Sequence, residues 1–269
     1  MGVFMIDKFA FPGPGIGYSM HNHSNFSDGD SSLEEMCRAA KASGLTLFGM
    51  SDHWVVPAYE GTGTESWRMA YDRLDEYVET LQKLQKELND DSFTLKIGLE
   101  VDFFFENMDE IFDHLKKYPL DYLIGSVHCC GTFPVDHAAS DWEPLPVEER
   151  NAICEMYWKK MEGAAARKEF SFLGHLDLPK KFDLIDNTRY IAHAARVLDI
   201  LQQNGGAIEL NTSGWFKPCA APYPAPEILK LANARRVPVI VNADAHHHAH
   251  VRRNFEEGYA LLNAAGYDF

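Results

Sequence analysis

The chain has 269 residues, of which 46% are hydrophobic and 24% are charged, a globular composition that excludes wholesale disorder. Its 25 Lys and Arg residues stand against 40 Asp and Glu residues, which gives a formal net charge of −15. This balance argues against a broad nucleic-acid surface and against docking on anionic lipid, because both need many cations. The chain also carries 12 histidines beside this excess of carboxylates.

The sequence predicts a cytoplasmic protein that does not enter a membrane. No apolar run is long enough to cross a bilayer, and the first residues lack the pattern of a signal peptide. The five cysteines are odd in number and form no C-x-x-C pair, so we expect reduced thiols.

Short apolar runs alternate with amphipathic stretches from one end of the chain to the other. The apolar runs predict buried strands, and the amphipathic stretches predict helices. We expect strands at 17–21, 45–51, 95–101, 122–127, 170–174, 207–210 and 237–242. We expect helices at 31–44, 67–88, 109–118, 146–168, 187–204, 226–235 and 251–264, the first opened by a capping box from Ser32 to Glu35.

Seven strand–helix units indicate parallel strands with helices outside them. The pattern favours an α/β barrel with one unit fewer than the common eight, formed as a single domain over residues 1–269. A doubly wound open sheet fits the same alternation and stays open as an alternative.

Each predicted strand is followed by a histidine or a carboxylate at or near its end. In a parallel barrel this edge is where sites are built. Residues i and i+2 of a strand share a face, so His21 with His23, and Asp244 with His246, can reach one ion together. The strand-end residues are His21, His23, His53, Glu100, Asp102, His128, His175, Asp177, Glu209, Asp244 and His246. Such a set suits Zn²⁺, Mn²⁺ or Fe²⁺ better than Ca²⁺, and it exceeds the needs of one ion.

The ordered motifs resemble those of the PHP (polymerase and histidinol phosphatase) family, and most closely its stand-alone histidinol-phosphate phosphatases. They run from residue 21 to 246 and read HNHSNFSDG, SDHW, GLEVDF, GSVH, LGHLD, IELNTSG and NADAH. The resemblance implies a distorted (β/α)7 barrel with two or three divalent metal ions. By motif, His21, His23, Glu100 and Asp244 would hold one ion; Glu100, His128 and His175 a second; and Asp28, His53 and His246 a third.

The expected reaction is hydrolysis of a small phosphate monoester, most simply L-histidinol phosphate, by a hydroxide that bridges two metals. We expect Asp244, Glu100 and His128 to be catalytic, with Asp244, Asp177 or a metal-bound water as the acid for the leaving group. Lys180, Lys181, Lys217 and Trp215 are the candidate substrate-binding residues. Lys180 and Lys181 follow the fifth motif, LGHLD, and Lys217 follows the sixth, IELNTSG. The sequence departs from the family at these positions, because the histidinol-phosphate enzymes tend to carry Arg after both motifs.

Three long loops, at 54–67, 129–146 and 212–226, are expected to wall the pocket. Their aromatic residues Trp54, Trp142, Trp215 and Tyr223 can contact substrate or cap the barrel, and Glu60 or Asp136 can pair with a substrate amine. Other readings remain open: a phosphoesterase for nucleotides or cyclic phosphodiesters, an amidohydrolase-like deaminase or amidase, a proofreading exonuclease module, and an inactive metal-binding domain.

Overall fold

The computed structural model describes residues 17–56 and 66–268. Its main sheet contains eight strands in the order β1-β2-β4-β5-β8-β9-β10, with β3 paired to β4, and every pairing is parallel. The strands are β1 Tyr18–Ser19, β2 Leu47–Met50, β3 His53–Trp54, β4 Thr94–Asp102, β5 Tyr122–Ser126, β8 Phe172–Leu173, β9 Ile208–Asn211 and β10 Val239–Asn242. The second predicted strand, 45–51, contains β2, whereas β3 follows just beyond its predicted end, and both pair with the long β4.

The first and last strands meet, so the sheet curls into a barrel rather than staying open. The Met20 N–H donates to Asn242 Oδ1 at 2.8 Å, and the His23 N–H donates to the Ala245 carbonyl at 2.9 Å. A parallel bridge also joins Asn22 to Ala245. Because β1 and β8 have only two residues each, the barrel is distorted. The predicted distorted (β/α)7 barrel is confirmed, and the doubly wound alternative is wrong.

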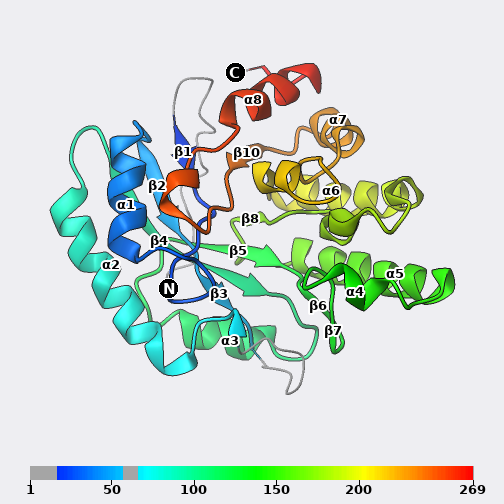
Figure 1. The fold of residues 1–269 in the computed structure, drawn as a ribbon, viewed down its shortest axis with the longest axis horizontal. Coiled ribbons are helices and arrows are strands. Elements are labelled where there is room, and N and C mark those ends of the chain that lie inside the picture. The colour runs from blue at the N-terminus through cyan, green and yellow to red at the C-terminus, as the bar shows by residue number, and fades with distance from the viewer. Residues whose placement is uncertain (1–16, 57–65, 269) are drawn as a thin grey trace.

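The helices lie around the outside of the strands (Figure 1). They are α1 Leu33–Ala42, α2 Leu74–Leu88, α3 Met108–Leu115, α4 Ala139–Trp142, α5 Val147–Ala165, α6 Ile191–Asn204, α7 Pro226–Ala234 and α8 Phe255–Ala264. The capping box is confirmed, since Ser32 N–H donates to Glu35 Oε2 at 2.8 Å and Glu35 N–H donates to Ser32 Oγ at 3.3 Å. Short 3-10 helices fill strand-to-helix loops at Tyr71–Arg73, Leu178–Phe182, Asn187–Tyr190, Thr212–Phe216 and His248–His250.

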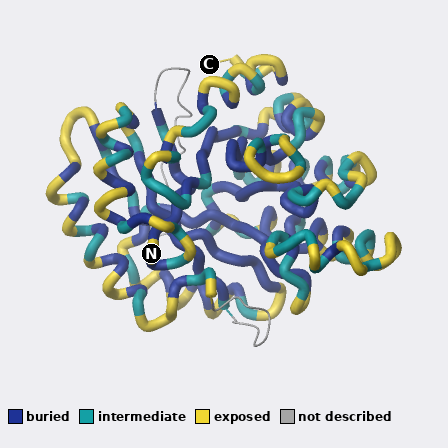
Figure 2. The backbone as a smooth tube through the Cα atoms, in the orientation of Figure 1, coloured by how far each residue is buried: buried dark blue, intermediate teal, exposed yellow. Residues whose placement is uncertain are grey.

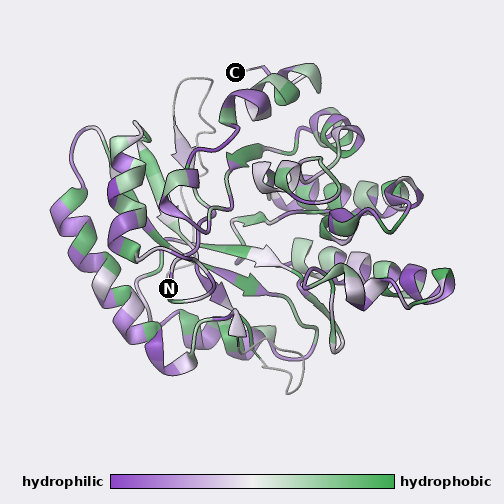
Figure 3. Cartoon of the chain, viewed as in Figure 1, coloured by the Kyte–Doolittle hydropathy of each residue, from purple (hydrophilic) through white to green (hydrophobic). Residues whose placement is uncertain are grey.

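Each long helix presents an apolar side to the strands and a polar side to solvent, which Figure 3 shows as alternating green and purple. In α2 the inward residues include Leu74, Tyr77, Leu81 and Leu88 at helical spacing. Figure 2 shows the resulting buried centre of strands inside an exposed outer surface. Among the described residues, no helix is both long and apolar enough to cross a membrane.

Helix α2 begins at Leu74, seven residues later than predicted. The preceding segment folds back to the edge of the barrel, where the Met69 N–H donates to the His53 carbonyl at 3.0 Å. The Trp67 ring lies 4.8 Å from the His53 ring and 5.3 Å from the His128 ring. The predicted helix therefore included a segment that instead packs against two histidines at the carboxyl edge of the strands.

The loop after β5 contains two short strands and a helix that the sequence did not predict. Strand β6, Cys129–Cys130, pairs antiparallel with β7, Phe133–Pro134, and α4 follows. Trp142 on α4 is buried and donates from Nε1 to the Val135 carbonyl at 3.0 Å. Trp54 is also buried and stacks on His114, so both tryptophans are packing residues. Glu60 and the middle of its loop lie outside the described residues.

Candidate metal centre and active site

The carboxyl ends of the strands bring all nine predicted metal ligands into one cluster. His21 and His23 follow β1, His53 belongs to β3, and Glu100 belongs to β4. His128 follows β5, His175 follows β8, and Asp244 and His246 follow β10, while Asp28 lies in the turn after His23. All of them are buried except Asp28, Asp244 and His246, which are partly open to the cleft.

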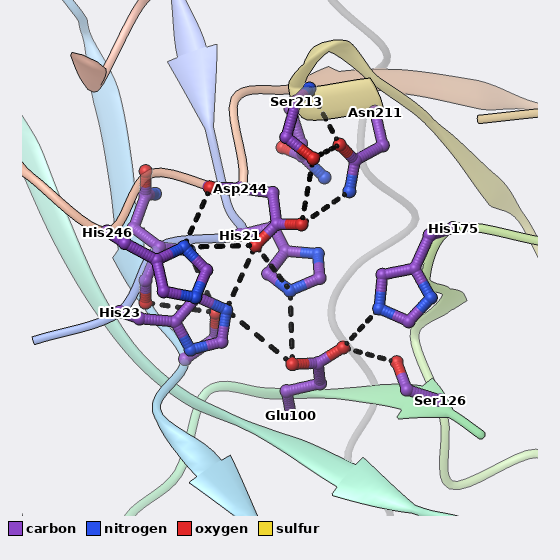
Figure 4. A network of polar contacts seen from close by, with 12 residues as sticks. His21, His23, Glu100, Ser126, His175, Asn211, Ser213, Asp244 and His246 are labelled. Carbon is purple, nitrogen blue, oxygen red and sulfur yellow. Dashed lines mark hydrogen bonds and ion pairs between the residues drawn. The ribbon is translucent and has the colours of Figure 1, made fainter. Parts of the chain in front are cut away.

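Glu100 lies at the centre of this cluster (Figure 4). Its Oε2 is 3.2 Å from His21 Nε2 and 2.8 Å from His53 Nδ1. Its Oε1 is 2.8 Å from His175 Nε2 and accepts a hydrogen bond from Ser126 Oγ at 2.6 Å. One carboxylate thus faces histidines on two sides, which is the arrangement a bridging ligand needs.

The ligand atoms form four overlapping groups, each with all its atoms within 4.8 Å of one another. The groups are His21–His23–Asp244, His21–Glu100–His175, His53–Glu100–His128 and His23–Asp28–His53–His246. The groups contain all nine predicted ligands but divide them differently from the sets that the resemblance implied, because His21 groups with Glu100 and His175, and His53 groups with Glu100 and His128. The assignment of residues to individual ions therefore stays a prediction.

The side chains of the cluster are arranged to bind divalent cations rather than to form hydrogen bonds with one another. Buried polar atoms in folded proteins normally have hydrogen-bond partners. Yet His21 Nε2, both ring nitrogens of His23, His53 Nδ1 and Glu100 Oε2 are buried, and their close contacts with one another do not have hydrogen-bond geometry. Imidazole and carboxylate donors in such groups suit Zn²⁺, Mn²⁺ or Fe²⁺. The residues present therefore fit a multinuclear metal centre.

Burial and close charges together displace the pKa values in this cluster. Burial alone would raise the pKa of Glu100, but the surrounding His21, His53 and His128 lower it well below its usual value. Asp244 behaves the same way, because His21 and His23 lower its pKa against the effect of burial. Burial, reinforced by His53 and His246, lowers the pKa of His23 to about 3. Against the effect of burial, Asp102 and Glu100 raise the pKa of His128 to about 10, so the imidazoles of the cluster do not share one protonation state.

A second layer of polar residues orients the ligands, and the sequence analysis assigned it no role. Glu209 accepts a hydrogen bond from His21 Nδ1 at 3.0 Å and from the His175 N–H at 2.7 Å. Asp102 accepts from His128 Nδ1 and, at 3.2 Å, from the His128 N–H. Such partners fix the ring orientation and tautomer of a ligating histidine. Both carboxylates lie in the strand-end motifs, and this position is the feature of the sequence that could have pointed to their role.

An open cleft of about 340 Å³ exposes part of the cluster, including His53, His128, His175, Asp244 and His246. This volume falls within the range of small-molecule sites. Two of the predicted substrate-binding residues, Lys181 and Lys217, line it, as do Asp136 and Tyr223. Lys181 donates from Nζ to the Asp136 carbonyl at 2.6 Å and to its Oδ2 at 3.2 Å.

The other two predicted substrate-binding residues, Lys180 and Trp215, are not among the described residues that line the cleft. The Lys180 ammonium is buried and donates to Asp177 Oδ2 at 2.8 Å and to the Pro222 carbonyl at 2.6 Å. The same Asp177 oxygen, Oδ2, also accepts hydrogen bonds from Asn187 Nδ2 and from the Ala225 N–H, both at 2.9 Å. Lys180 and Asp177 thus connect the loop between β8 and α6 to the loop between β9 and α7.

Comparison with known proteins identifies the family. A model of the PHP domain matches residues 19–213. The chain belongs to the PHP domain family. This PHP domain is 34% identical to a protein of Deinococcus radiodurans named probable histidinol-phosphatase, over 86% of each chain. It is 24% identical to a protein of the same name from Schizosaccharomyces pombe, over 92% of this chain and 86% of the relative.

A solved structure shares the fold of this PHP domain. It is the histidinol phosphate phosphatase of Lactococcus lactis, determined with zinc, L-histidinol and phosphate. The two structures superpose with a TM-score of 0.78 at 21% sequence identity, over 94% of each chain. At this identity the likeness supports the distorted barrel.

Proposed function

We propose that this PHP domain is a metal-dependent phosphomonoesterase that hydrolyses L-histidinol phosphate to L-histidinol and phosphate. The observation that carries the proposal is the fully assembled strand-end cluster, which opens to a cleft of suitable size in a chain 34% identical to a probable histidinol-phosphatase. Lysines at the cleft favour a phosphoryl group over the amide that a deaminase or amidase would bind.

Three sets of side chains would hold the metal ions. His21, His23, Asp244 and Glu100 form one set, Glu100 with His128 and His175 the next, and Asp28 with His53 and His246 the last. When bound, the ions supply an activated water and neutralise charge on the phosphoryl oxygens.

Asp244 is best placed as a ligand rather than as the acid for the leaving group. Its Oδ1 lies 3.2 Å from His23 Nε2, and its Oδ2 accepts from Asn211 Nδ2 at 3.0 Å and from Ser213 Oγ at 3.2 Å. Its lowered pKa keeps the carboxylate ionised. Asp177 is also unsuited to proton donation, because it is fully buried, is not among the described residues that line the cleft, and accepts three hydrogen bonds on Oδ2.

The organic half of the substrate would lie between the loops that close the cleft. Tyr223 offers an aromatic wall, while Asp136 and Asp30 add carboxylates that can pair with an amine or an imidazolium group. We further propose a cytoplasmic enzyme that binds no nucleic acid, since all five cysteines are free and the chain carries a net charge of −15.

Phosphate release by the metal-loaded protein tests this proposal. The panel comprises L-histidinol phosphate, nucleoside monophosphates and cyclic phosphodiesters, each assayed with Mn²⁺, Fe²⁺ and Zn²⁺ and with a chelator-treated control. We expect the highest kcat/KM for L-histidinol phosphate and no release after chelation. Turnover of a different phosphoester alone would overturn the substrate, and no turnover of any phosphoester would overturn the activity.

A further inference from the structure

One arginine in the cleft has no role in the motifs that carry the family resemblance. Arg253 lies in the turn between the His246 motif and α8, and its side chain lines the cleft. Its Nε is buried and has no hydrogen-bond acceptor among residues 17–56 and 66–268. A buried guanidinium N–H without a partner carries an energetic penalty unless a ligand supplies the acceptor.

The surroundings hold Arg253 in place without neutralising it. The guanidinium carbon lies 3.7 Å from the centre of the Phe216 ring. The backbone is fixed on both sides, because the Arg253 N–H donates to the His250 carbonyl at 3.0 Å and Thr212 Oγ1 donates to the Arg253 carbonyl at 2.7 Å. A stacked, immobilised guanidinium is pre-organised to bind an anion.

No carboxylate among the described residues forms an ion pair with Arg253. The charge of Asp244 acts on it, but the oxygens of Asp244 face His21, His23, Asn211 and Ser213. Burial lowers the pKa of Arg253, and only Asp244 opposes that effect.

Two of the lysines in this region are less available than Arg253 to bind an anion, because carboxylates already pair with them. Lys180 is bound to Asp177, and Lys181 is bound to Asp136. Lys217 lines the same cleft as Arg253 from an exposed position. Among the described residues that line the cleft, Arg253 is therefore the cation that combines a buried unpartnered donor with a stacking contact on an aromatic ring.

We propose that Arg253 binds the phosphoryl group of the substrate, and the phosphate product, through hydrogen bonds from its guanidinium, with Lys217 as an accessory charge. Guanidinium matches two phosphoryl oxygens at once, which a single ammonium does not. This inference rests on the proposed phosphomonoesterase function for its substrate class. It accounts for how a chain with lysines after its fifth and sixth motifs still provides an arginine for phosphate.

The test compares Arg253→Gln with Arg252→Gln. Arg252 is an ideal control because it is adjacent, exposed and directed away, with Nη1 donating to the Ser43 carbonyl at 3.1 Å. Titration calorimetry of the metal-loaded proteins measures the affinity for inorganic phosphate, and metal content is determined on the same samples. We expect Arg253→Gln to bind phosphate roughly 10- to 100-fold more weakly with unchanged metal content, as loss of a charge-assisted hydrogen bond implies. Arg252→Gln should match the wild type.

A second measurement needs no substitution. Phenylglyoxal labels accessible arginines, and peptide mapping separates residue 253 from residue 252. Saturating phosphate should slow labelling of Arg253 several-fold and leave Arg252 unchanged. Equal phosphate affinity in Arg253→Gln and wild type, or labelling of Arg253 that phosphate does not slow, would overturn the inference. Phosphate binding through Arg253 in a protein that does not hydrolyse L-histidinol phosphate would refute that substrate while leaving this site in place.

Discussion

Glu209 is buried behind the metal cluster and receives four hydrogen-bond donors on two oxygens. Oε1 accepts from the His175 N–H and from Asn211 Nδ2, Oε2 accepts from Asn242 Nδ2 at 2.8 Å, and His21 Nδ1 lies 3.0–3.1 Å from both. Replacing Glu209 with Gln keeps the shape but exchanges one acceptor oxygen for an NH2 group. In either orientation the new amide nitrogen faces a donor.

The neighbours cannot turn to relieve this conflict without breaking other hydrogen bonds. Asn242 Oδ1 accepts from the Met20 N–H at 2.8 Å, and Asn211 Oδ1 accepts from the Ser213 N–H at 2.9 Å. Glu209→Gln thus removes a charge-assisted bond, worth about 1.5–3 kcal/mol, and leaves a buried donor unsatisfied. We expect a loss of about 3 kcal/mol in the free energy of unfolding, which lowers Tm by roughly 6–12 °C in a chain of this size.

Thermal unfolding followed by circular dichroism, with metal content measured on the same preparations, provides the assay. Loss of the partner of His21 should also weaken metal binding roughly 10- to 100-fold. Glu79→Gln is the control, since Glu79 is exposed on α2 and should change neither quantity. A Glu209→Gln protein with wild-type Tm and metal affinity would refute the role assigned to this residue.

Three further changes probe other parts of the site. His128→Ala should lose metal and phosphate release together, because His128 lies between Glu100 and His175, whereas His114→Ala on the exposed side of α3 should retain both. Lys180→Met should lower the free energy of unfolding by about 3 kcal/mol, because Asp177 stays buried without its ammonium partner. The affinity for phosphate, measured 20 °C below Tm, should not change; a weaker affinity would indicate that Lys180 binds the substrate directly. Chelation should lower Tm reversibly, since a metal at 100 times its Kd stabilises the folded state by about 2.7 kcal/mol; a Tm insensitive to chelator would argue against an ordered metal centre.

The sequence predicted the barrel and the ligand cluster because both follow from one rule of parallel strands. Their carboxyl ends meet at one edge, so strand-end residues such as His21, Glu100 and His175 had to converge whatever the details of the loops. The division into sets came from the family resemblance. Glu209 was visible at a strand end, but whether it binds an ion or orients His21 depends on distances that sequence does not contain.

Loop residues were harder to place because their environment depends on local pairing. Lys180 looked like a cleft cation from its position after the fifth motif, but it lies three residues from Asp177 and binds it. Arg253 lay inside a predicted helix, yet Asn254 adopts a left-handed conformation with φ of 58° and delays α8 to Phe255. That change leaves Arg253 in the turn before α8, where it lines the cleft.

Anomalous scattering from metal-loaded crystals tests the metal centre most directly. We predict peaks within the three sets that the family resemblance implies: His21, His23, Glu100 and Asp244; Glu100, His128 and His175; and Asp28, His53 and His246. Ions bound elsewhere, or no ordered ion in a protein that still releases phosphate, would contradict the account.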